Sequence, residues 1–192
     1  MTPTMTHNDY LIRVDFLSPD VLNAPGQIAM TNVPGKRPMS SKSIKKEDLK
    51  KDLANLRNHY NIDHLVCLLE PEELSILGIK NLLAQAQKTK LSVEQFGIPD
   101  DGLPSSMQQF AALVDSVITS IAAGNTVAIH CHGGKGRTGM LAACCLVQLG
   151  YSPDAAIALV RNIRPGTIEP AIKEDYVRHF AKYRNTVLSN KN

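Results

Sequence analysis

The 192-residue sequence has few cysteines and no long apolar run. Its four cysteines, Cys67, Cys131, Cys144 and Cys145, lack the spacing of a disulfide framework, so a reducing, cytoplasmic setting fits best. No apolar run approaches the length that a membrane-spanning helix needs, and we expect no integral membrane segment. The first nine residues are polar, so we also expect no secretory leader.

Repeats, low-complexity tracts and linkers are also absent. Hydrophobic residues make up 43% of the chain and charged residues 20%, which is typical of a globular protein. We therefore predict a single domain over residues 1–192, with its core at about 10–187. The net charge of +3 and the lack of a recognisable motif argue against nucleic acid, whereas a mildly basic protein suits an acidic, phosphorylated partner. The oligomeric state is not predicted.

The apolar periodicity alternates between strands and helices. Strand-like runs lie at residues 10–17, 27–33, 64–69 and 91–96, and another precedes residue 130. Helical spacing covers residues 44–60, a short turn after Pro71, and residues 79–88, 105–123, 140–149, 153–164 and 170–187. Ser43 and Ser105 are the expected N-caps of two of these helices. This order predicts an α/β fold with three layers, in which helices flank a central, mainly parallel sheet.

The most informative stretch is residues 130–139, with the sequence HCHGGKGRTG, between two apolar runs. It predicts a buried strand, a tight loop and a helix. Five residues separate Cys131 from Arg137, and three of them are glycine, so backbone amides can gather around one anion at the start of the helix. The predicted phosphate-binding residues are His132, Gly133, Gly134, Lys135, Gly136 and Arg137.

Cys131 lies at the mouth of this predicted cradle. The field that binds an anion also favours a thiolate, which makes Cys131 the candidate nucleophile. Arg137 can offer a planar fork to two phosphate oxygens, and Thr138 can donate its hydroxyl to the sulfur. The plainer alternative is a glycine-rich turn that happens to contain Cys and Arg.

This pattern resembles the active-site signature of the cysteine-dependent protein tyrosine phosphatase superfamily. Further pieces of the sequence are NVPG at residues 32–35, VC at 66–67 followed by EEL at 72–74, and IPD at 98–100 with Pro104. With these pieces the chain is similar to the dual-specificity subgroup, especially the kinase-associated phosphatase type, over residues 28–183. The resemblance implies a tyrosine-phosphatase-like fold and a phosphocysteine intermediate. It also implies a phosphorylated protein or small phosphomonoester as substrate, and neither cofactor nor metal. Three consecutive residues such as 130–132 cannot easily converge on one metal ion, which favours the same conclusion.

A general acid is expected in residues 97–104, GIPDDGLP, because the leaving oxygen needs a proton. Paired Asp residues in a Pro/Gly-rich segment suit a mobile catalytic loop, although the same residues are common in ordinary turns. The resemblance selects Asp100 as the acid, and Asp101 is the alternative.

The chain also departs from its relatives. Many of them carry a glutamine that positions the hydrolytic water, but no Gln lies between residues 162 and 182. Glu169, Lys173 or Glu174 occupies that neighbourhood, and the choice is left open. The length excludes the deep recognition loop of classical tyrosine-specific domains, so a shallow pocket that also admits phosphoserine and phosphothreonine is expected.

Lys135 leaves a second substrate class open. Lipid-acting relatives carry two lysines in this loop; Lys135 matches the second, whereas His132 replaces the first. The match makes phosphoinositides or inositol phosphates the alternative substrates, and the plainer alternative is a solvent-facing lysine with no selective role. A phosphate-reading binding protein with little turnover is the non-enzymatic alternative, although Cys131, Arg137 and Asp100 are all present.

Two other groups of residues have both a plain and a functional interpretation. Cys144 and Cys145 fit core positions, and Cys67 is either a buried strand residue or a redox partner of Cys131. A basic run is either a solvated loop or a lip that steers phosphorylated substrates, and it contains Lys36, Arg37, Lys42, Lys45 and Lys46.

Overall fold

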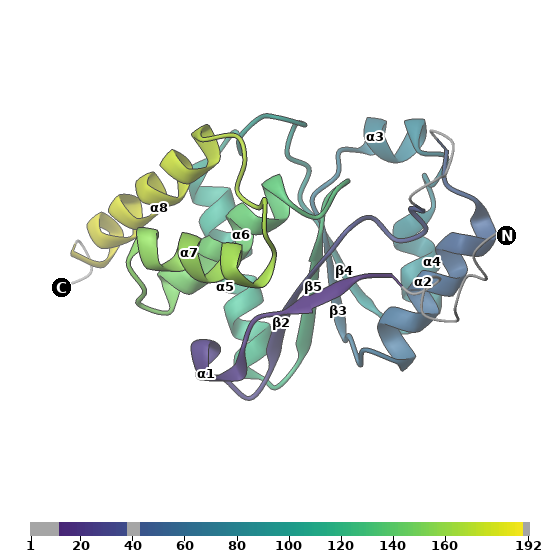
Figure 1. Cartoon of the computed structure of the whole chain (residues 1–192), viewed down its shortest axis with the longest axis horizontal. Coiled ribbons are helices and arrows are strands. Elements are labelled where there is room, and N and C mark those ends of the chain that lie inside the picture. Colours follow the sequence, from purple (N-terminus) through teal and green to yellow (C-terminus); the bar gives the residue numbers. More distant parts are fainter. Residues whose placement is uncertain (1–11, 38–42, 190–192) are drawn as a thin grey trace, which may run out of the picture.

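The computed structural model describes residues 12–37 and 43–189, and a five-stranded sheet runs through its middle (Figure 1). The strand order is β1-β2-β5-β3-β4. β1 is antiparallel to β2, and the other neighbours are parallel. The strands are β1 (Val14–Phe16), β2 (Gln27–Thr31), β3 (His64–Cys67), β4 (Ser92–Gln95) and β5 (Thr126–His130).

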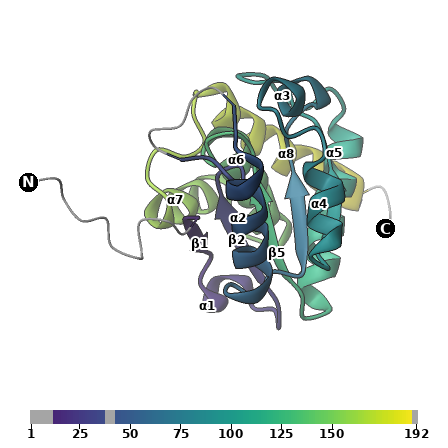
Figure 2. The same cartoon turned by 90° about the vertical axis from the view of Figure 1, so that its right-hand side faces the viewer.

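Helices cover both faces of the sheet, which confirms the predicted three-layer α/β fold (Figures 1 and 2). One face carries α2 (Lys46–Asn58), α3 (Pro71–Ile76) and α4 (Leu82–Lys88), which lie in front of the sheet in Figure 2. The other face carries α5 (Met107–Ala122), α6 (Gly136–Gln148), α7 (Pro153–Ile163) and α8 (Ile172–Ser189). A single turn, α1 (Pro19–Leu22), precedes β2.

The alternation of side chains along each strand divides the core into two parts. On β2, Ile28 and Met30 pack towards α5–α8, whereas Ala29 faces α2–α4. On β5, Ile129 packs towards α5–α8 and Ala128 faces α2–α4. Because successive side chains of a strand point to opposite faces, one short strand contributes to both halves of the core.

α6 is the most enclosed helix of the molecule. Every residue from 137 to 146 is buried, because the helix lies between the sheet and the helices α5, α7 and α8. Cys144 and Cys145 are fully buried within it, as the sequence predicted. A helix packed on all sides cannot shift easily, so the loop that precedes it is held firmly.

The element boundaries differ from the expected ones by a few residues. Ser106, rather than Ser105, caps α5 by accepting a bond from the Gln109 amide, and Lys45 takes the N-cap position of α2 in place of Ser43. The turn α1 was not predicted, because four residues are too short for a periodic signal. Across residues 12–37 and 43–189, we find no helix with both the length and the apolar character that a membrane span requires.

Candidate active site

The CX5R loop lies where β5 ends and α6 begins, at the carboxyl edge of the parallel strands. Its fold depends on glycine at two positions. Gly134 has φ +67°, and a Cβ there would lie 2.3 Å from the Thr31 carbonyl oxygen. A Cβ on Gly136 would lie 2.7 Å from the Glu169 oxygen. The loop can therefore lie closely against β2 on one side and the α7–α8 connection on the other.

The carbonyl groups of the loop point outwards to fixed partners. The His132 oxygen accepts from the Val33 amide at 3.2 Å, and the Lys135 oxygen accepts from the Gly139 amide at 2.9 Å. The Gly133 oxygen lies 3.5 Å from the guanidinium of Arg164, which is buried and paired with Asp15. Within the described ranges, no protein acceptor meets the amides of residues 132–135. These donors are left available for an anion.

Arg137 is oriented by a carboxylate that sequence analysis did not assign to the site. Its Nη1 donates to Glu73 Oε2 at 2.7 Å, and its Nη2 donates to Glu73 Oε1 at 2.9 Å. Glu73 Oε2 also accepts from the Glu70 amide, which fixes the carboxylate at the start of α3. Burial would lower the pKa of Arg137, but the bond with Glu73 and nearby negative charges raise it overall, so the guanidinium stays charged.

The predicted acid segment reaches the same guanidinium. Nη1 of Arg137 also donates to the Ile98 carbonyl at 2.8 Å, and Nη2 contacts Asp100 Oδ1 at 3.0 Å. The Asp100 side chain is 69% exposed, whereas that of Glu73 is 19% exposed. Asp101 has φ +56° and is also exposed. A single, solvent-exposed contact with Arg137 therefore holds the Asp100 side chain beside the loop.

A small pocket of about 130 Å³ joins these residues. This volume suits the phosphate end of a substrate, because sites that enclose whole small molecules are several-fold larger, roughly 300 Å³ or more. Gly134 and Thr138 do not line the pocket, and Glu174 pairs with Arg161 instead. The lining residues are Asp100, Asp101, Cys131, His132, Gly133, Lys135, Gly136, Arg137, Glu169 and Lys173.

The neighbours of Cys131 were only partly predicted. Its side chain is nearly buried, and Nδ1 of His130 lies 3.2 Å from the Cys131 carbonyl oxygen. Burial lowers the pKa of His130 to about 4, so this ring is neutral at pH 7. The Thr138 hydroxyl is buried without a hydrogen-bond partner, and the expected bond to the sulfur is not formed in this structure.

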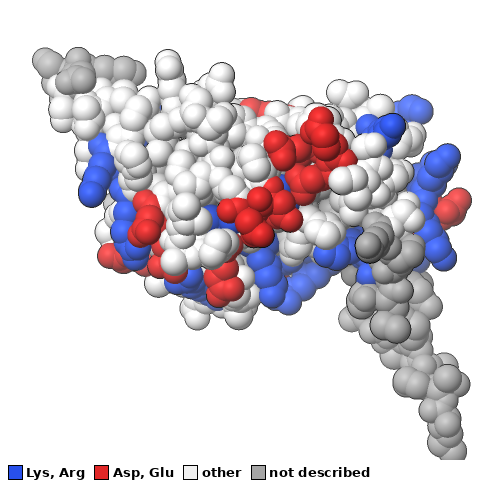
Figure 3. Space-filling model, turned by 90° about the horizontal axis from the view of Figure 1, so that it is seen from above, with Lys and Arg blue, Asp and Glu red and all other residues white. Residues whose placement is uncertain are grey.

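The face above the pocket carries both signs of charge. In Figure 3, acidic side chains gather near its middle and basic ones lie around them. Arg37, from the predicted basic lip, is pinned by Asp52 at 2.7 Å, and Lys36 lies beside Gly133 in a neighbouring hollow. Lys42 lies outside the described residues. The face around the pocket is therefore not generally basic, and the unpaired donors close to the pocket are those of the loop.

Cys67 ends β3, beside His130 of β5 in the register of the sheet. Its thiol is buried and free, and desolvation raises its pKa to about 12. Cys67 is therefore a protonated thiol at neutral pH. The predicted redox pairing with Cys131 stays a prediction.

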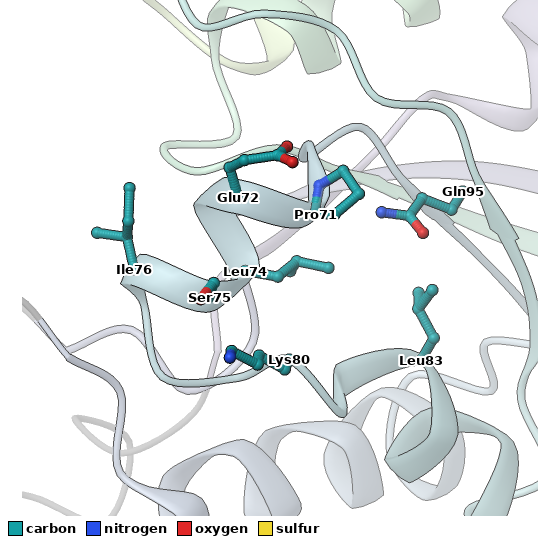
Figure 4. Close-up of a pocket in the computed structure, with 8 residues that line it drawn as sticks. All are labelled: Pro71, Glu72, Leu74, Ser75, Ile76, Lys80, Leu83 and Gln95. Atoms are coloured by element: carbon teal, nitrogen blue, oxygen red, sulfur yellow. The ribbon is translucent and has the colours of Figure 1, made fainter.

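A larger hollow of about 560 Å³ lies between α3 and α4 (Figure 4). Leu74 and Leu83 point into it, whereas Ile76 points away. Among its described lining residues there is no nucleophile beside a base, so we assign the chemistry to the smaller pocket.

Comparisons with known proteins agree with this geometry. Residues 33–177 match the domain family described as "Swiss Army Knife protein, DSP-PTPase phosphatase domain". The chain is 27% identical over 183 residues to cyclin-dependent kinase inhibitor 3 of Mus musculus, covering 94% of this chain and 83% of the relative.

Solved structures show the same likeness. The crystal structure of kinase-associated phosphatase, with its catalytic cysteine replaced by serine, aligns with a TM-score of 0.80 at 25% identity. The alignment covers 90% of this chain and 95% of that one. The structure of PTPMT1 with PI(5)P shares the fold, with a TM-score of 0.67 at 17% identity over 84% of this chain and 94% of that one. With its matching domain, sheet order and CX5R loop, this chain belongs to the DSP-PTPase phosphatase family, and the predicted likeness to the kinase-associated phosphatase type is confirmed.

Proposed function

We propose that this protein is a metal-independent phosphatase that hydrolyses phosphotyrosine, phosphoserine and phosphothreonine in proteins. The observation that carries the proposal is one phosphate-sized pocket that joins Cys131, a fixed Arg137 and loop residues whose amides meet no acceptor among the described residues. Its small volume supports a shallow site that does not depend on the length of the phosphorylated side chain. The similarity to cyclin-dependent kinase inhibitor 3 and to kinase-associated phosphatase, both named for protein kinases, supports a protein as the substrate.

In the first step, Cys131 attacks phosphorus, and the bond from phosphorus to the leaving oxygen breaks. The loop amides and Arg137 stabilise the charge on the equatorial oxygens, and Asp100 gives its proton to the leaving oxygen. A cysteinyl-phosphate remains. In the second step, Asp100 takes a proton from water as the water attacks phosphorus, and the thiolate leaves. Thr138, which follows Arg137 directly in the chain, is proposed to assist its departure.

Substrate binding must first release Asp100 from Arg137. While Nη2 of Arg137 donates to it, Asp100 Oδ1 is held on the guanidinium and away from the leaving oxygen. A phosphate that takes over the Nη2 donor leaves Asp100 free to move to the leaving oxygen with a proton taken from solvent. The exposure of Asp100 supports this exchange, because little packing holds the side chain in place.

The test is turnover of an aryl phosphate by the full chain, followed by acid quenching and mass mapping of the phosphorylated peptide. We expect a burst of the aryl alcohol, and phosphate carried on Cys131. Cys131→Ser should lose nearly all turnover and still bind tungstate. Undiminished turnover by Cys131→Ser would refute the mechanism, and tungstate binding without any turnover by the parent would favour a phosphate-reading protein.

The second candidate is a phosphoinositide or inositol-phosphate phosphatase. Lys135 supports it, because this exposed lysine lines the pocket beside the loop and is useful mainly for a substrate with further negative charge. Specificity constants for a matched set of phosphopeptides and inositol phosphates separate the two classes. A preference of at least 100-fold for the inositol phosphates would overturn the protein-phosphatase assignment.

A further inference from the structure

Lys173 is a buried lysine beside the catalytic loop. It lies in the first turn of α8 and is only 2% exposed, although lysine is rarely buried without a partner. Its methylene groups pack along the loop, since a Cβ on Gly136 would lie 3.3 Å from Lys173 Cε and 3.5 Å from Cδ. The side chain also lines the pocket that contains Cys131 and Arg137. Its stem is therefore enclosed, and its end faces the reacting centre.

The ammonium group of Lys173 has no protein partner. In the described part of the chain, it makes no hydrogen bond and no ion pair, although the Lys173 amide donates to the Pro170 oxygen at 2.9 Å. Nζ of Lys173 is not among the fully buried side-chain atoms, so the ammonium reaches solvent through the pocket while its stem is enclosed. A charge placed in this way is available to a ligand that enters the pocket.

The charges around Lys173 all belong to the proposed site. Burial lowers its pKa, and Asp101, Arg137, Asp100 and the Cys131 sulfur then act on it, in that order. Both carboxylates come from the acid loop, where Asp100 is exposed and already contacts Arg137. A phosphate bound between the loop amides and Arg137 would add an anion within the pocket that Lys173 lines.

The connection before α8 is built to hold this lysine. Ile168 is buried and has φ +62°, a conformation that β-branched residues rarely adopt. Arg161 donates to the Thr167 oxygen at 3.1 Å and secures the turn. Strained turns of this kind persist where the surrounding structure fixes them, often at binding sites.

We propose that the Lys173 ammonium binds a non-bridging oxygen of the substrate's phosphoryl group, from α8, in addition to Arg137 from α6. This role rests on the proposed phosphatase function. It makes Lys173 a catalytic residue that keeps its proton throughout and stabilises negative charge on the phosphate in both steps.

The test separates binding from turnover. In the full-length Cys131→Ser parent, tungstate affinity is measured by calorimetry for Lys173→Met, Lys173→Gln and the matched control Lys182→Met, an exposed lysine on the same helix. We expect Lys173→Met and Lys173→Gln to lower the affinity for tungstate at least tenfold, and Lys182→Met to change this affinity less than twofold. Tungstate binding by either Lys173 variant within twofold of the parent would overturn the proposal.

Thermal melting distinguishes a functional from a structural lysine. Met keeps an apolar stem in the same enclosed space, so the melting temperature of Lys173→Met should stay close to that of the parent, whereas the loss of a lysine that supports the fold would lower it. Failure of both Lys173 variants to fold would assign a structural role and refute the proposal. A parent enzyme without phosphatase turnover would refute the proposed function alone, because tungstate binding is measured without turnover.

Discussion

Two carboxylates from separate segments of the chain meet the guanidinium of Arg137, and they differ in geometry and exposure. Glu73, on α3, forms a bidentate pair, has a backbone amide as a further donor and is mostly enclosed. Asp100, on the loop before α5, forms one contact and is mostly exposed. The difference suggests a division of labour, in which the enclosed carboxylate orients the cation and the exposed one moves and exchanges protons.

We expect the largest effect from a substitution of Arg137, the partner that both carboxylates share. Arg137→Lys keeps a positive charge but loses the planar fork, so Glu73 and Asp100 can no longer be held together with a phosphate. We expect kcat/KM for an aryl phosphate to fall by about 100- to 1,000-fold. Steady-state kinetics measures it, with Arg184→Lys on α8 as the control. A loss below fivefold would contradict a bidentate role.

The next largest effect is expected from a substitution of Asp100, the exposed carboxylate. Asp100→Asn removes the proposed acid, and we expect a loss of about 100-fold on substrates with poor leaving groups and much less on good ones. The basic limb of the pH–rate profile should become flat. Asp101→Asn is the matched control one residue away. If Asp101→Asn shows this pattern and Asp100→Asn does not, the acid has been assigned one residue too early.

A smaller effect is expected from a substitution of Glu73, the enclosed carboxylate. Glu73→Gln leaves a mostly buried guanidinium with a neutral partner, and we expect about a tenfold loss of kcat/KM that does not depend on the leaving group or on pH. Stability should fall by about 1–3 kcal/mol, whereas Asp100→Asn should change it by about 0.5 kcal/mol or less. Urea titration measures both. Equal losses of stability in the two variants would remove the proposed contrast.

The smallest effect concerns Lys135, a charge outside the shared guanidinium. An exposed ammonium contributes about 1 kcal/mol or less, and salt weakens it. Lys135→Ala should leave a small aryl phosphate nearly unchanged and raise KM a few-fold for polyphosphorylated inositols, less so in high salt. An equal loss on both substrates would mean that Lys135 shapes the loop itself.

The sequence predicted those parts of the site that are contiguous in the chain. Residues 130–139 alone indicated the strand, the loop and the helix, because glycine spacing and apolar flanks are local signals. Asp100 was reached through resemblance, and the structure places it in the pocket. Its role as the acid stays a prediction.

Other features depend on contacts between distant residues. Glu73 lies 64 residues before Arg137. The residues around Glu73 indicate an acidic side chain in the first turn of a helix, and they do not indicate that it pairs with Arg137. Lys173 was one of three candidates for positioning water, and nothing local indicated that it is buried. Helix starts were misplaced where adjacent residues could serve equally, as with Ser105 and Ser106.

The buried ring of His130 has a consequence for any measurement in acid. Its pKa is lowered from 6.5 to about 4 in the folded chain, so the unfolded chain binds the proton more tightly. The stabilisation is complete above pH 6.5 and is lost as the pH falls towards 4, on the order of 3 kcal/mol in all. Assay buffers near pH 5 would thus lower the stability of the folded chain through the residue that directly precedes Cys131. A fall of activity in acid would then reflect unfolding as well as catalysis.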